Sequence, residues 1–457
     1  MPEITPIILA GGESKRIRSK LTKTLHPVCG RPMIEYPLQA ASAVGAKKIL
    51  VVVPNQKSHP LVSYLQSKKN VQLVAQKQPR GTGDAVQSCA SALRGNGGRV
   101  LIMCGDTPLL RSETLKDFLK WSGSQNSKVS FITAKLDRPE GWGGRVVRDL
   151  SGRILKIVEE KELNEEEKGI KEFNTGVYSV EAKWLLEALK RLKAHPTGEY
   201  YLTDIIAEAL LDSDGAAGFL AGDPFEFLGV NTRLQLGVVN EAMRNRLVRH
   251  WMERGVTFVD PRHVYLETDV TIGPDTVIYP QVHLRGQTHI GSDCVIEAGS
   301  ILKDMKVGNG VEVKPYSVLE SSELKKGAII GPFARIRPDS VVGEGARVGN
   351  FVELKKAKLD AGVKVNHLTY LGDAHIGSGT NVGCGTITCN YDGKKKHPTK
   401  IGKKVFIGSD VQFIAPVTVG DGAYIAAGST VTENVPPKAL AIARSRQINK
   451  KGWANKK

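Results

Sequence analysis

Aliphatic residues return at every sixth position through much of the second half of the chain, often with a glycine directly behind them. An α-helix would repeat about every 3.6 residues and a half-buried strand every second residue, so neither explains the pattern. A short strand and a turn fill six residues, and three such units make one coil of a parallel β-helix with its aliphatic side chains stacked inside. The residues that carry the period are Ile272, Ile278, Leu284, Ile290, Ile296 and Leu302, then Val318, Leu324, Ile330, Ile336, Val342, Val348 and Leu354, then Ile401, Ile407, Phe413, Val419, Ile425 and Val431.

The first half of the chain has a different pattern of hydrophobic and polar residues. From residue 4 to about residue 230, short aliphatic runs alternate with amphipathic stretches, which predicts an α/β domain with a Rossmann-like, mainly parallel sheet. We therefore expect an α/β domain over residues 1–230, a linker helix over 231–254, and a β-helix domain with a C-terminal tail over 255–457. The expected strands are 7–10, 49–53, 72–75 and 100–103, and the expected helices are 33–43, 84–93 and 184–192.

Composition is typical of a soluble globular protein. Hydrophobic residues make up 41% of the 457 residues, and no apolar run approaches the roughly 18 to 20 residues of a membrane span. Residues 1–12 lack the charged flank and the length of a secretory signal. The six cysteines form no CxxC pair and no Cys/His spacing typical of a metal site. We therefore expect a cytoplasmic protein with reduced thiols and no zinc.

The formal net charge is +17. A basic protein can bind nucleic acid, but the Lys and Arg residues here are dispersed, with short clusters only at 394–396 and in the C-terminal tail. The distribution favours phosphorylated small molecules as partners, and we expect no nucleic acid.

The first predicted strand ends in a glycine turn, Leu9-Ala10-Gly11-Gly12, with Arg16 and Lys23 soon after it. Glycines behind a parallel strand let backbone N–H groups approach an anion, and the two cations can neutralise phosphate charge. The spacing is neither that of a P-loop nor that of a dinucleotide fingerprint. Taken alone, two glycines at the end of a strand are more often a tight turn than a nucleotide site.

Further polar residues follow the other predicted strands, where ligands of parallel sheets bind. Gln76 and the Gly81-Thr82 pair come after one strand, and Asp106 follows Gly105 at the end of another. An Asp in this place can hold a divalent cation beside a phosphate or can be a structural cap. Three later residues in aliphatic surroundings are candidates for sugar hydroxyl contacts and a second metal ligand: Glu159, Asn174 and Asn231.

A β-helix alone is compatible with a mere spacer or oligomerisation device, but polar residues interrupt this repeat. His367 lies at the wall of a coil, and Asn390-Tyr391 opens a break that ends near Lys400. Imidazoles ordinarily titrate near about pH 6.5, so a neutral His can take a proton from an attacking amine. Cationic and polar residues fall on nearby coils, and they are Arg337, Lys355 and Asn381.

In order and spacing, the segments of the first half resemble the sugar-1-phosphate nucleotidyltransferases. With the hexapeptide domain, nearly the whole chain is similar to the bifunctional family that joins N-acetylglucosamine-1-phosphate uridyltransferase to glucosamine-1-phosphate N-acetyltransferase. The resemblance implies a left-handed parallel β-helix and homotrimers. It also implies acetyl transfer from acetyl-CoA to glucosamine-1-phosphate in the C-terminal domain, then uridylyl transfer from UTP with release of pyrophosphate in the N-terminal domain. The product, UDP-N-acetylglucosamine, is a precursor of peptidoglycan and lipopolysaccharide.

The same resemblance assigns roles to residues. Asp106 and Asn231 are expected to hold Mg²⁺, and Glu159 and Asn174 to contact the sugar. His367 matches the catalytic base through the HLTYLGD segment, in which Tyr370 lies. The expected uridylyl site comprises Leu9, Ala10, Gly11, Gly12, Arg16, Lys23, Gln76, Gly81, Thr82, Asp106, Gly144, Glu159, Asn174 and Asn231. The expected amino-sugar phosphate contacts are Arg337, Lys355, Tyr370 and Asn381, and the expected acetyl-CoA contacts are Asn390, Tyr391, Ser409, Ala427 and Arg444, with Ser409 or a backbone N–H steadying the oxyanion.

The chain departs from the family pattern in three places. Glu13-Ser14 replaces Lys and Gly in the phosphate loop, and the family's GYGR segment is here Gly141-Trp142-Gly143-Gly144-Arg145. We expect Gly144 to face the sugar. Cys384 replaces an Ala, where it either crowds the thioester or is a small buried hydrophobe, which we favour.

Two other functions fit parts of the sequence. A sugar nucleotidyltransferase with a regulatory β-helix would not need His367, Lys355 and the Asn390-Tyr391 pair. A scaffold or exchange-factor subunit with decayed sites would not need Asp106 or Lys23. The bifunctional transferase accounts for all of them.

Overall fold

The computed structural model describes residues 3–12, 15–95, 97–212 and 215–456. The chain forms two compact units, 1–243 and 244–457, and the division falls inside helix α9 (Arg233–Met252). This helix falls within residues 231–254, over which the sequence predicts a helix. Among the described residues, no helix combines the length and the apolar character needed to cross a lipid bilayer.

A nine-stranded sheet forms the centre of the first unit, with the order β11-β7-β10-β6-β1-β4-β5; β8 also pairs with β10, and β9 pairs with β8. Neighbouring strands are parallel except at β10, which runs antiparallel to β6, β7 and β8, and at the antiparallel β8–β9 pair. The strands are β1 (Ile4–Leu9), β4 (Ile49–Pro54), β5 (Val71–Gln76), β6 (Arg99–Cys104), β7 (Val129–Lys135), β8 (Arg145–Arg148), β9 (Ile154–Val158), β10 (Glu172–Glu181) and β11 (Ala216–Leu220); β2 (Pro27–Val28) and β3 (Arg31–Pro32) form a separate hairpin.

Helices cover both faces of this sheet. Successive buried residues of a strand point to opposite faces, so Ile8 packs in the core beneath α1, α2 and α5, whereas Ile7 packs in the core beneath α3, α4, α7 and α8. The α-helices are α1 (Glu35–Ala43), α2 (Pro60–Leu65), α3 (Thr82–Gln87), α4 (Ala90–Leu93), α5 (Ser112–Ser124), α6 (Glu165–Lys168), α7 (Ala182–Arg191) and α8 (Asp204–Leu210).

The predicted helix over 84–93 is wrong as a single element. It is broken between α3 and α4, where the N–H of Cys89 donates to the carbonyl of Val86, three residues back instead of four. Such a 3₁₀ turn tightens the backbone and ends the α-helical ladder. The other predicted strands and helices are present, with bounds that differ by a few residues.

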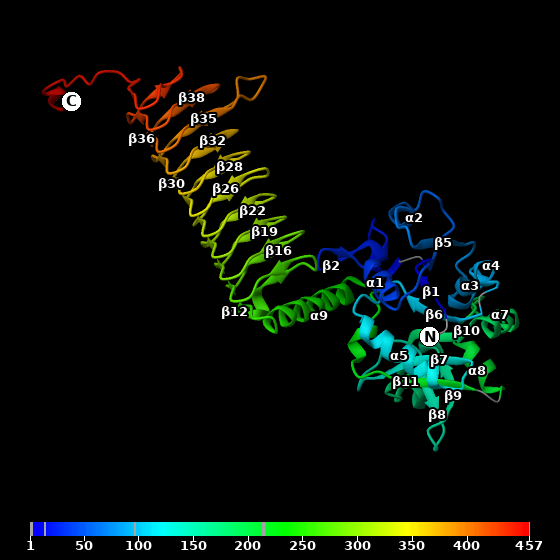
Figure 1. Cartoon of the computed structure of the whole chain (residues 1–457). Helices are drawn as coiled ribbons and strands as arrows, with labels where there is room; N and C mark the ends of the chain where they lie inside the picture. The colour runs from blue at the N-terminus through cyan, green and yellow to red at the C-terminus, as the bar shows by residue number, and fades with distance from the viewer. Residues whose placement is uncertain (1–2, 13–14, 96, 213–214, 457) are drawn as a thin grey trace. The chain divides into compact units, whose positions relative to one another are not determined.

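Figure 1 shows short strands stacked coil on coil in the second unit. They form three parallel stacks, which are the three walls of a β-helix. One coil contributes one strand to each wall, so Val277 pairs with Val295 and Val295 with Glu312. The aliphatic residues that face inward form one continuous core along the coils.

The first stack contains β12 (Thr257–Phe258), β15 (Val277–Ile278), β18 (Val295–Ile296), β21 (Glu312–Val313), β24 (Ile329–Ile330), β27 (Arg347–Asn350), β30 (Lys364–His367), β33 (Asn381–Val382), β36 (Phe406–Ile407), β39 (Tyr424–Ile425) and β41 (Leu440–Ala441). The second contains β13 (Tyr265–Leu266), β16 (His283–Arg285), β19 (Ile301–Lys303), β22 (Val318–Glu320), β25 (Arg335–Ile336), β28 (Glu353–Lys355), β31 (Tyr370–Gly372), β34 (Ile387–Cys389), β37 (Gln412–Ile414) and β40 (Thr430–Val431). The third contains β14 (Thr271–Ile272), β17 (His289–Ile290), β20 (Lys306–Val307), β23 (Glu323–Leu324), β26 (Val341–Val342), β29 (Lys358–Leu359), β32 (Ala374–Ile376), β35 (Thr399–Ile401) and β38 (Val417–Val419).

One member of the predicted aliphatic period is wrong. Val318 is partly exposed, and the side chain that enters the core from β22 is Leu319. The inward residues before and after it are Val313 and Leu324, so the step from Leu319 to Leu324 is one residue shorter than the regular repeat. Every other member of the three predicted runs is buried.

Candidate functional site

A cavity of about 530 Å³ opens in the first unit at the carboxyl ends of β1, β5 and β6. This is the edge of a parallel sheet at which ligands bind. Nine predicted residues line it, namely Leu9, Ala10, Gly11, Gly12, Lys23, Gln76, Gly81, Thr82 and Asp106. Five lining residues were not predicted: Thr24, Pro79, Ala85, Cys104 and Glu199.

Position 81 needs a glycine for two reasons, its backbone conformation and the lack of space for a Cβ atom. Its φ is +97°, and a Cβ there would lie 2.5 Å from the carbonyl oxygen of Tyr200. That carbonyl accepts the N–H of Gly83, and the N–H of Leu202 donates to the Thr82 hydroxyl at 3.0 Å. The 200–202 segment therefore holds the glycine loop in place at the cavity.

Gly81→Ala is expected to raise the KM for UTP, the nucleotide that the resemblance implies, and to lower the melting temperature. The new methyl group meets backbone atoms and the φ is unfavourable for Ala, at a cost of about 1–3 kcal/mol. Gly45→Ala is the matched control, since Gly45 has a φ of +84° with no atom within 4 Å of its Cβ position. Kinetics of pyrophosphate release and thermal unfolding of both variants check this. Equal losses in the two variants would mean that contact with Tyr200 is irrelevant.

Gln76 holds the two glycine segments of the cavity together. Its side-chain amide donates to Asp84 at 2.8 Å and to the carbonyl of Gly81 at 3.3 Å. Its Oε1 atom would lie 2.8 Å from a Cβ at Gly11, so the first glycine turn must approach it without a side chain. The two segments thus present backbone to the same cavity, as an anion-binding site requires.

Lys23 joins the two predicted metal ligands. Its Nζ donates to Asp106 Oδ2 at 2.5 Å and to Asn231 Oδ1 at 3.0 Å. Two oxygens from segments far apart in the sequence therefore converge on one cation. Among the described residues, no group of three His, Cys, Asp or Glu side chains is placed to hold a metal ion, so an ion here would need phosphate or water oxygens as well.

The predicted sugar contacts, Asn174 and Glu159, are both held by hydrogen bonds within the first unit. Asn174 donates its amide to the Tyr178 hydroxyl at 2.6 Å, and its oxygen accepts the N–H of Gly176. A Cβ at Gly176 would lie 3.3 Å from the sulfur of Cys104, which lines the cavity. Glu159 accepts the Thr203 hydroxyl at 2.7 Å, and burial raises the pKa of its carboxyl group.

Burial also raises the pKa of the Cys104 thiol to about 12, with the nearby Asp106 adding to the shift. The thiol is therefore protonated at neutral pH, and it acts as a small apolar wall of the cavity.

The altered glycine segment is fixed by buried polar contacts. The carbonyl of Gly144 accepts the N–H of Asn174 at 2.8 Å, and a Cβ at Gly143 would meet the carbonyl oxygen of Asn174 at 2.7 Å. The buried Arg145 donates to the carbonyl of Gly143. Both glycines thus lie against the predicted sugar contact Asn174. Arg16 is exposed on the 3₁₀ turn at 15–17, and Glu13 and Ser14 lie outside the described residues.

In the second unit, one corner of the β-helix carries a ladder of predicted residues. Val365, Val382, Ile407 and Ile425 pair in register on successive coils. Each is followed two residues later by a predicted site residue at the same corner of its coil. These are His367, Cys384, Ser409 and Ala427. Arg444 donates to the carbonyl of Ala427, so it lies at the end of this ladder. Cys384 is half-buried between His367 and Ser409.

His367 has a defined hydrogen-bond partner that the sequence did not point to. Its Nδ1 lies 2.9 Å from Asn350 Oδ1, and the two residues pair in register between β27 and β30. An amide oxygen only accepts hydrogen bonds, so Nδ1 of neutral His367 carries the ring proton and donates it to this bond, and Nε2 is the nitrogen that can take a proton. The side chain of His367 is exposed.

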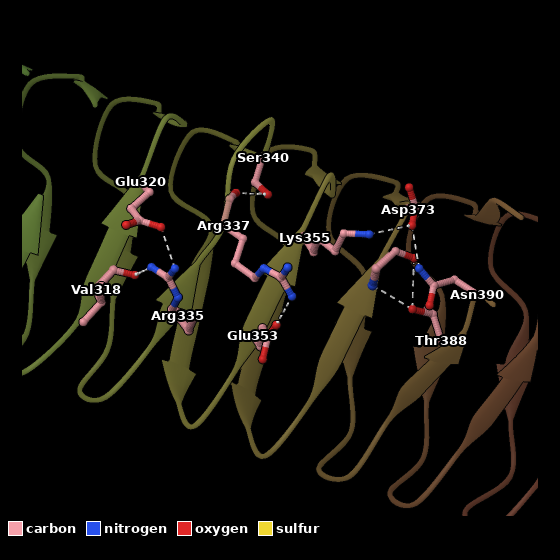
Figure 2. A network of polar contacts seen from close by, with 11 residues as sticks. Val318, Glu320, Arg335, Arg337, Ser340, Glu353, Lys355, Asp373, Thr388 and Asn390 are labelled. Carbon is pink, nitrogen blue, oxygen red and sulfur yellow. Dashed lines mark hydrogen bonds and ion pairs between the residues drawn. The ribbon is translucent and has the colours of Figure 1, made fainter. Parts of the chain in front are cut away.

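The second stack carries the cationic residues. Figure 2 shows Arg337, Glu353, Lys355, Asp373 and Asn390 following one another along this wall. Arg337 donates to Glu353 at 2.8 Å, a bond that raises the pKa of its guanidinium group. Lys355 lies 3.6 Å from Asp373. Tyr370 lies on β31, which pairs with β28 in the same stack.

The loop from Asn390 to about Lys400 returns to these cations. Asn390 is buried, whereas Tyr391 is 60% exposed with its hydroxyl donating to the carbonyl of Gly393. Lys396 lies beside Lys355, whose charge lowers the pKa of the Lys396 ammonium. Asn381 lies on β33, in register with Lys364 and Phe406 on the first stack.

Sequence reasoning missed Asn350, Asp373, Glu353 and Lys396. Asn350 stands two residues after Val348, just as His367 stands two residues after Val365, so an alignment of the coils on their strand pairs would have found it. Asp373 closes the HLTYLGD segment, and Lys396 belongs to the basic cluster at 394–396. Their roles depend on neighbours from other coils.

Comparisons with known proteins agree with both halves of the chain. A family model described as nucleotidyl transferase matches residues 5–251, and one described as bacterial transferase hexapeptide (six repeats) matches residues 269–304 and 398–433.

Full-length relatives share the name "Bifunctional protein GlmU". The one from Pelobacter propionicus is 45% identical over 454 residues, which cover 99% of this chain and 98% of the relative. The one from Geotalea uraniireducens is 44% identical over 458 residues and 100% of both chains. The one from Caldanaerobacter subterraneus subsp. tengcongensis is 46% identical over 458 residues, covering 100% of this chain and 99% of the relative.

The matched regions confirm the predicted fold class, an α/β nucleotidyltransferase domain followed by a left-handed parallel β-helix of hexapeptide repeats. The matches to these relatives cover both domains of the chain. The chain belongs to the family of bifunctional GlmU proteins, and the predicted enzyme, which joins a uridyltransferase and an acetyltransferase in one chain, is confirmed.

Proposed function

We propose that this enzyme acetylates glucosamine-1-phosphate with acetyl-CoA in its second unit and then transfers a uridylyl group from UTP to the product in its first unit. The observation that carries the proposal is the presence of two separate constellations in one chain. One is the cavity in which Lys23, Asp106 and Asn231 converge, and the other is His367 beside the cations of the β-helix.

In the uridylyl site, the phosphate oxygen of the sugar attacks the α-phosphorus of UTP and displaces pyrophosphate. The reaction needs alignment and charge stabilisation more than covalent help. The glycine segments at 11–12 and 81–82 offer backbone N–H groups to the nucleotide, and Lys23 balances phosphate charge as it approaches. Glu159 and Asn174 orient the N-acetyl sugar.

Asp106 and Asn231 would hold Mg²⁺ in this site. Their oxygens already converge on the Lys23 ammonium, so a carboxylate and an amide oxygen can reach one cation. Mg²⁺ keeps several waters and takes phosphate oxygens as further ligands, which fits a site with two protein donors. When bound, the ion would neutralise the charge that develops on the phosphate oxygens.

In the acetyl site, Nε2 of His367 takes a proton from the amino group of glucosamine-1-phosphate as the nitrogen attacks the thioester carbonyl. The proton then passes to the departing CoA sulfur. Arg337, Lys355 and Tyr370 bind the sugar phosphate, and Asn390 lies beside them. Ser409 and Ala427 continue the ladder from His367 and offer their surface to acetyl-CoA.

We further propose a homotrimer, to which the hexapeptide fold is suited, and work in the cytoplasm, where both UTP and acetyl-CoA are made. UDP-N-acetylglucosamine, the product, would supply peptidoglycan and lipopolysaccharide synthesis.

An omission assay tests the proposal. With glucosamine-1-phosphate, acetyl-CoA, UTP and Mg²⁺ present, the enzyme is expected to release both CoA and pyrophosphate. Leaving out acetyl-CoA should stop both signals, because the second reaction uses the acetylated sugar. Leaving out UTP, or chelating Mg²⁺ with EDTA, should stop only pyrophosphate release. CoA release that depends on Mg²⁺, or pyrophosphate release without acetyl-CoA, would contradict the proposed order.

A further inference from the structure

A single carboxylate joins two groups of the acetyl site that come from different coils. Asp373 Oδ2 accepts a hydrogen bond from Asn390 Nδ2 at 2.5 Å and lies 3.6 Å from Lys355 Nζ (Figure 2). Asn390 is 6% exposed, and the side chains of Lys355 and Asp373 are 12% and 22% exposed. Contacts that are this well shielded from water constrain their partners more than surface contacts do.

The backbone on both sides fixes the carboxylate. The N–H of Asp373 donates to the carbonyl of Lys355 at 2.9 Å, and its carbonyl accepts the N–H of Thr399 at 3.1 Å. Asp373 is thus tied to the coil before it and to the strand after the 390–398 loop. Its φ of +48° is a conformation that Asp and Asn tolerate better than most residues.

The backbone of Asn390 is fixed by hydrogen bonds on both sides, and the contact with Asp373 fixes the orientation of its side-chain amide. Its N–H donates to the carbonyl of Thr388 at 2.9 Å, and its carbonyl accepts the N–H of His397 at 2.8 Å. An ionised carboxylate accepts hydrogen bonds and donates none, so the amide nitrogen must face Asp373 and the amide oxygen must face away from it.

The amide lies next to a predicted substrate contact. A Cβ at Gly372 would collide with both the Tyr370 hydroxyl and the Asn390 amide, so these two groups meet over Gly372. Thr388, buried in β34, holds Gly372 in place by accepting its N–H at 2.7 Å. The amide nitrogen is therefore the atom that lies beside Tyr370 and Asp373, and the amide oxygen is turned away from them with a fixed direction.

We infer that Asp373 is a positioning residue for acetyl transfer, which turns the amide oxygen of Asn390 toward the amino group of the acceptor sugar and holds the Lys355 ammonium toward its phosphate. The inference rests on the proposed acetyltransferase function. A protonated or free amine donates hydrogen bonds, so an acceptor oxygen is the group that would recognise it.

The Asp373→Asn variant tests this, because it keeps the shape of the side chain and removes its charge. The new amide can present either its oxygen or its nitrogen, so Asn390 loses its imposed orientation. We expect kcat for CoA release to fall about 10- to 100-fold, as for other small misplacements of reacting groups. The KM for glucosamine-1-phosphate should change by less than about threefold, since losing the acidic charge favours phosphate binding while the loosened Lys355 opposes it.

A double exchange, Asp373→Asn with Asn390→Asp, distinguishes a role in orienting the Asn390 amide from a role in stabilising the fold alone. It restores an amide–carboxylate pair but places the negative charge where the acceptor oxygen belongs. We expect it to recover the melting temperature without recovering kcat, and this expectation holds even if Asp373→Asn alone does not fold. Asp360→Asn is the control, since Asp360 pairs with His375 at 3.0 Å on another wall.

Circular dichroism and the melting temperature report folding of the β-helix in each variant, and pyrophosphate release from N-acetylglucosamine-1-phosphate and UTP checks that the first unit is unaffected. If kcat for CoA release stays within about threefold of the wild type in Asp373→Asn, or returns to it in the double exchange, the positioning role is wrong. If the wild-type enzyme itself releases no CoA with glucosamine-1-phosphate, the proposed function fails instead.

Discussion

Asp106→Ala is expected to lower pyrophosphate release by about 10³-fold while leaving CoA release from acetyl-CoA within about twofold of the wild type. The carboxylate of Asp106 bonds to Lys23 at 2.5 Å and is the only charged member of the proposed magnesium pair. Its loss would remove an ion ligand and the acidic partner of the Lys23 ammonium, which keeps its bond to the neutral Asn231 oxygen. Charge stabilisation by a bound ion is worth several kcal/mol, and each ~1.4 kcal/mol is tenfold in rate.

Separate assays of the two reactions check this, with N-acetylglucosamine-1-phosphate as the acceptor for uridylyl transfer. Asp117→Asn, which changes an exposed carboxylate on α5, controls for general charge effects in the same domain. If a folded Asp106→Ala enzyme loses both activities, the proposal that the two reactions use independent sites is wrong. Unchanged pyrophosphate release would remove Asp106 from the nucleotide site.

The period of six predicted the β-helix because each inward residue contributes to the repeat on its own, without knowledge of its neighbours. It went wrong at Val318, where the shorter step to Leu324 shifts the register by one residue and brings Leu319 into the core. A count over residues cannot locate such a step, since both Val318 and Leu319 are aliphatic. Pairing between strands of successive coils determines it.

The candidate residues of the first unit could be predicted from the sequence. The carboxyl ends of parallel strands lie at the same edge of a sheet, so Gly11, Gln76 and Asp106 were expected to lie close together. The contacts that support these residues could not be predicted from the sequence. Tyr200, whose carbonyl excludes any side chain at Gly81, lies far along the chain in a segment with no recognisable motif. The Lys23 bond that joins Asp106 to Asn231 likewise depends on tertiary structure.

The acetyl site shows the same division. His367 and Lys355 were visible as departures from the repeat, whereas Asn350 and Asp373 look like ordinary turn residues in the sequence. Their meaning comes from the register between coils, which places Asn350 beside His367 and Asp373 between Lys355 and the residue after β34. Turn residues of one coil are therefore the natural supports for reactive residues of the next.

His367→Ala is expected to lower kcat for CoA release by about 10²- to 10⁴-fold, the usual contribution of a general base, and to leave uridylyl transfer to N-acetylglucosamine-1-phosphate unchanged. The side chain is exposed, so its removal creates no cavity in the core and should hardly change the melting temperature. Because Asn350 accepts from Nδ1, the lost function is that of Nε2.

His375→Ala is the matched control for this prediction. His375 is also exposed and lies on β32 of the same coil, but its Nε2 pairs with Asp360 at 3.0 Å on the third wall, away from the ladder that contains His367. The control should keep full CoA release. If His367→Ala keeps it as well, proton transfer from the amine proceeds without this ring, and the base must be sought among the other groups of the acetyl site. If both variants lose it equally, the effect is one of coil stability and not of proton transfer.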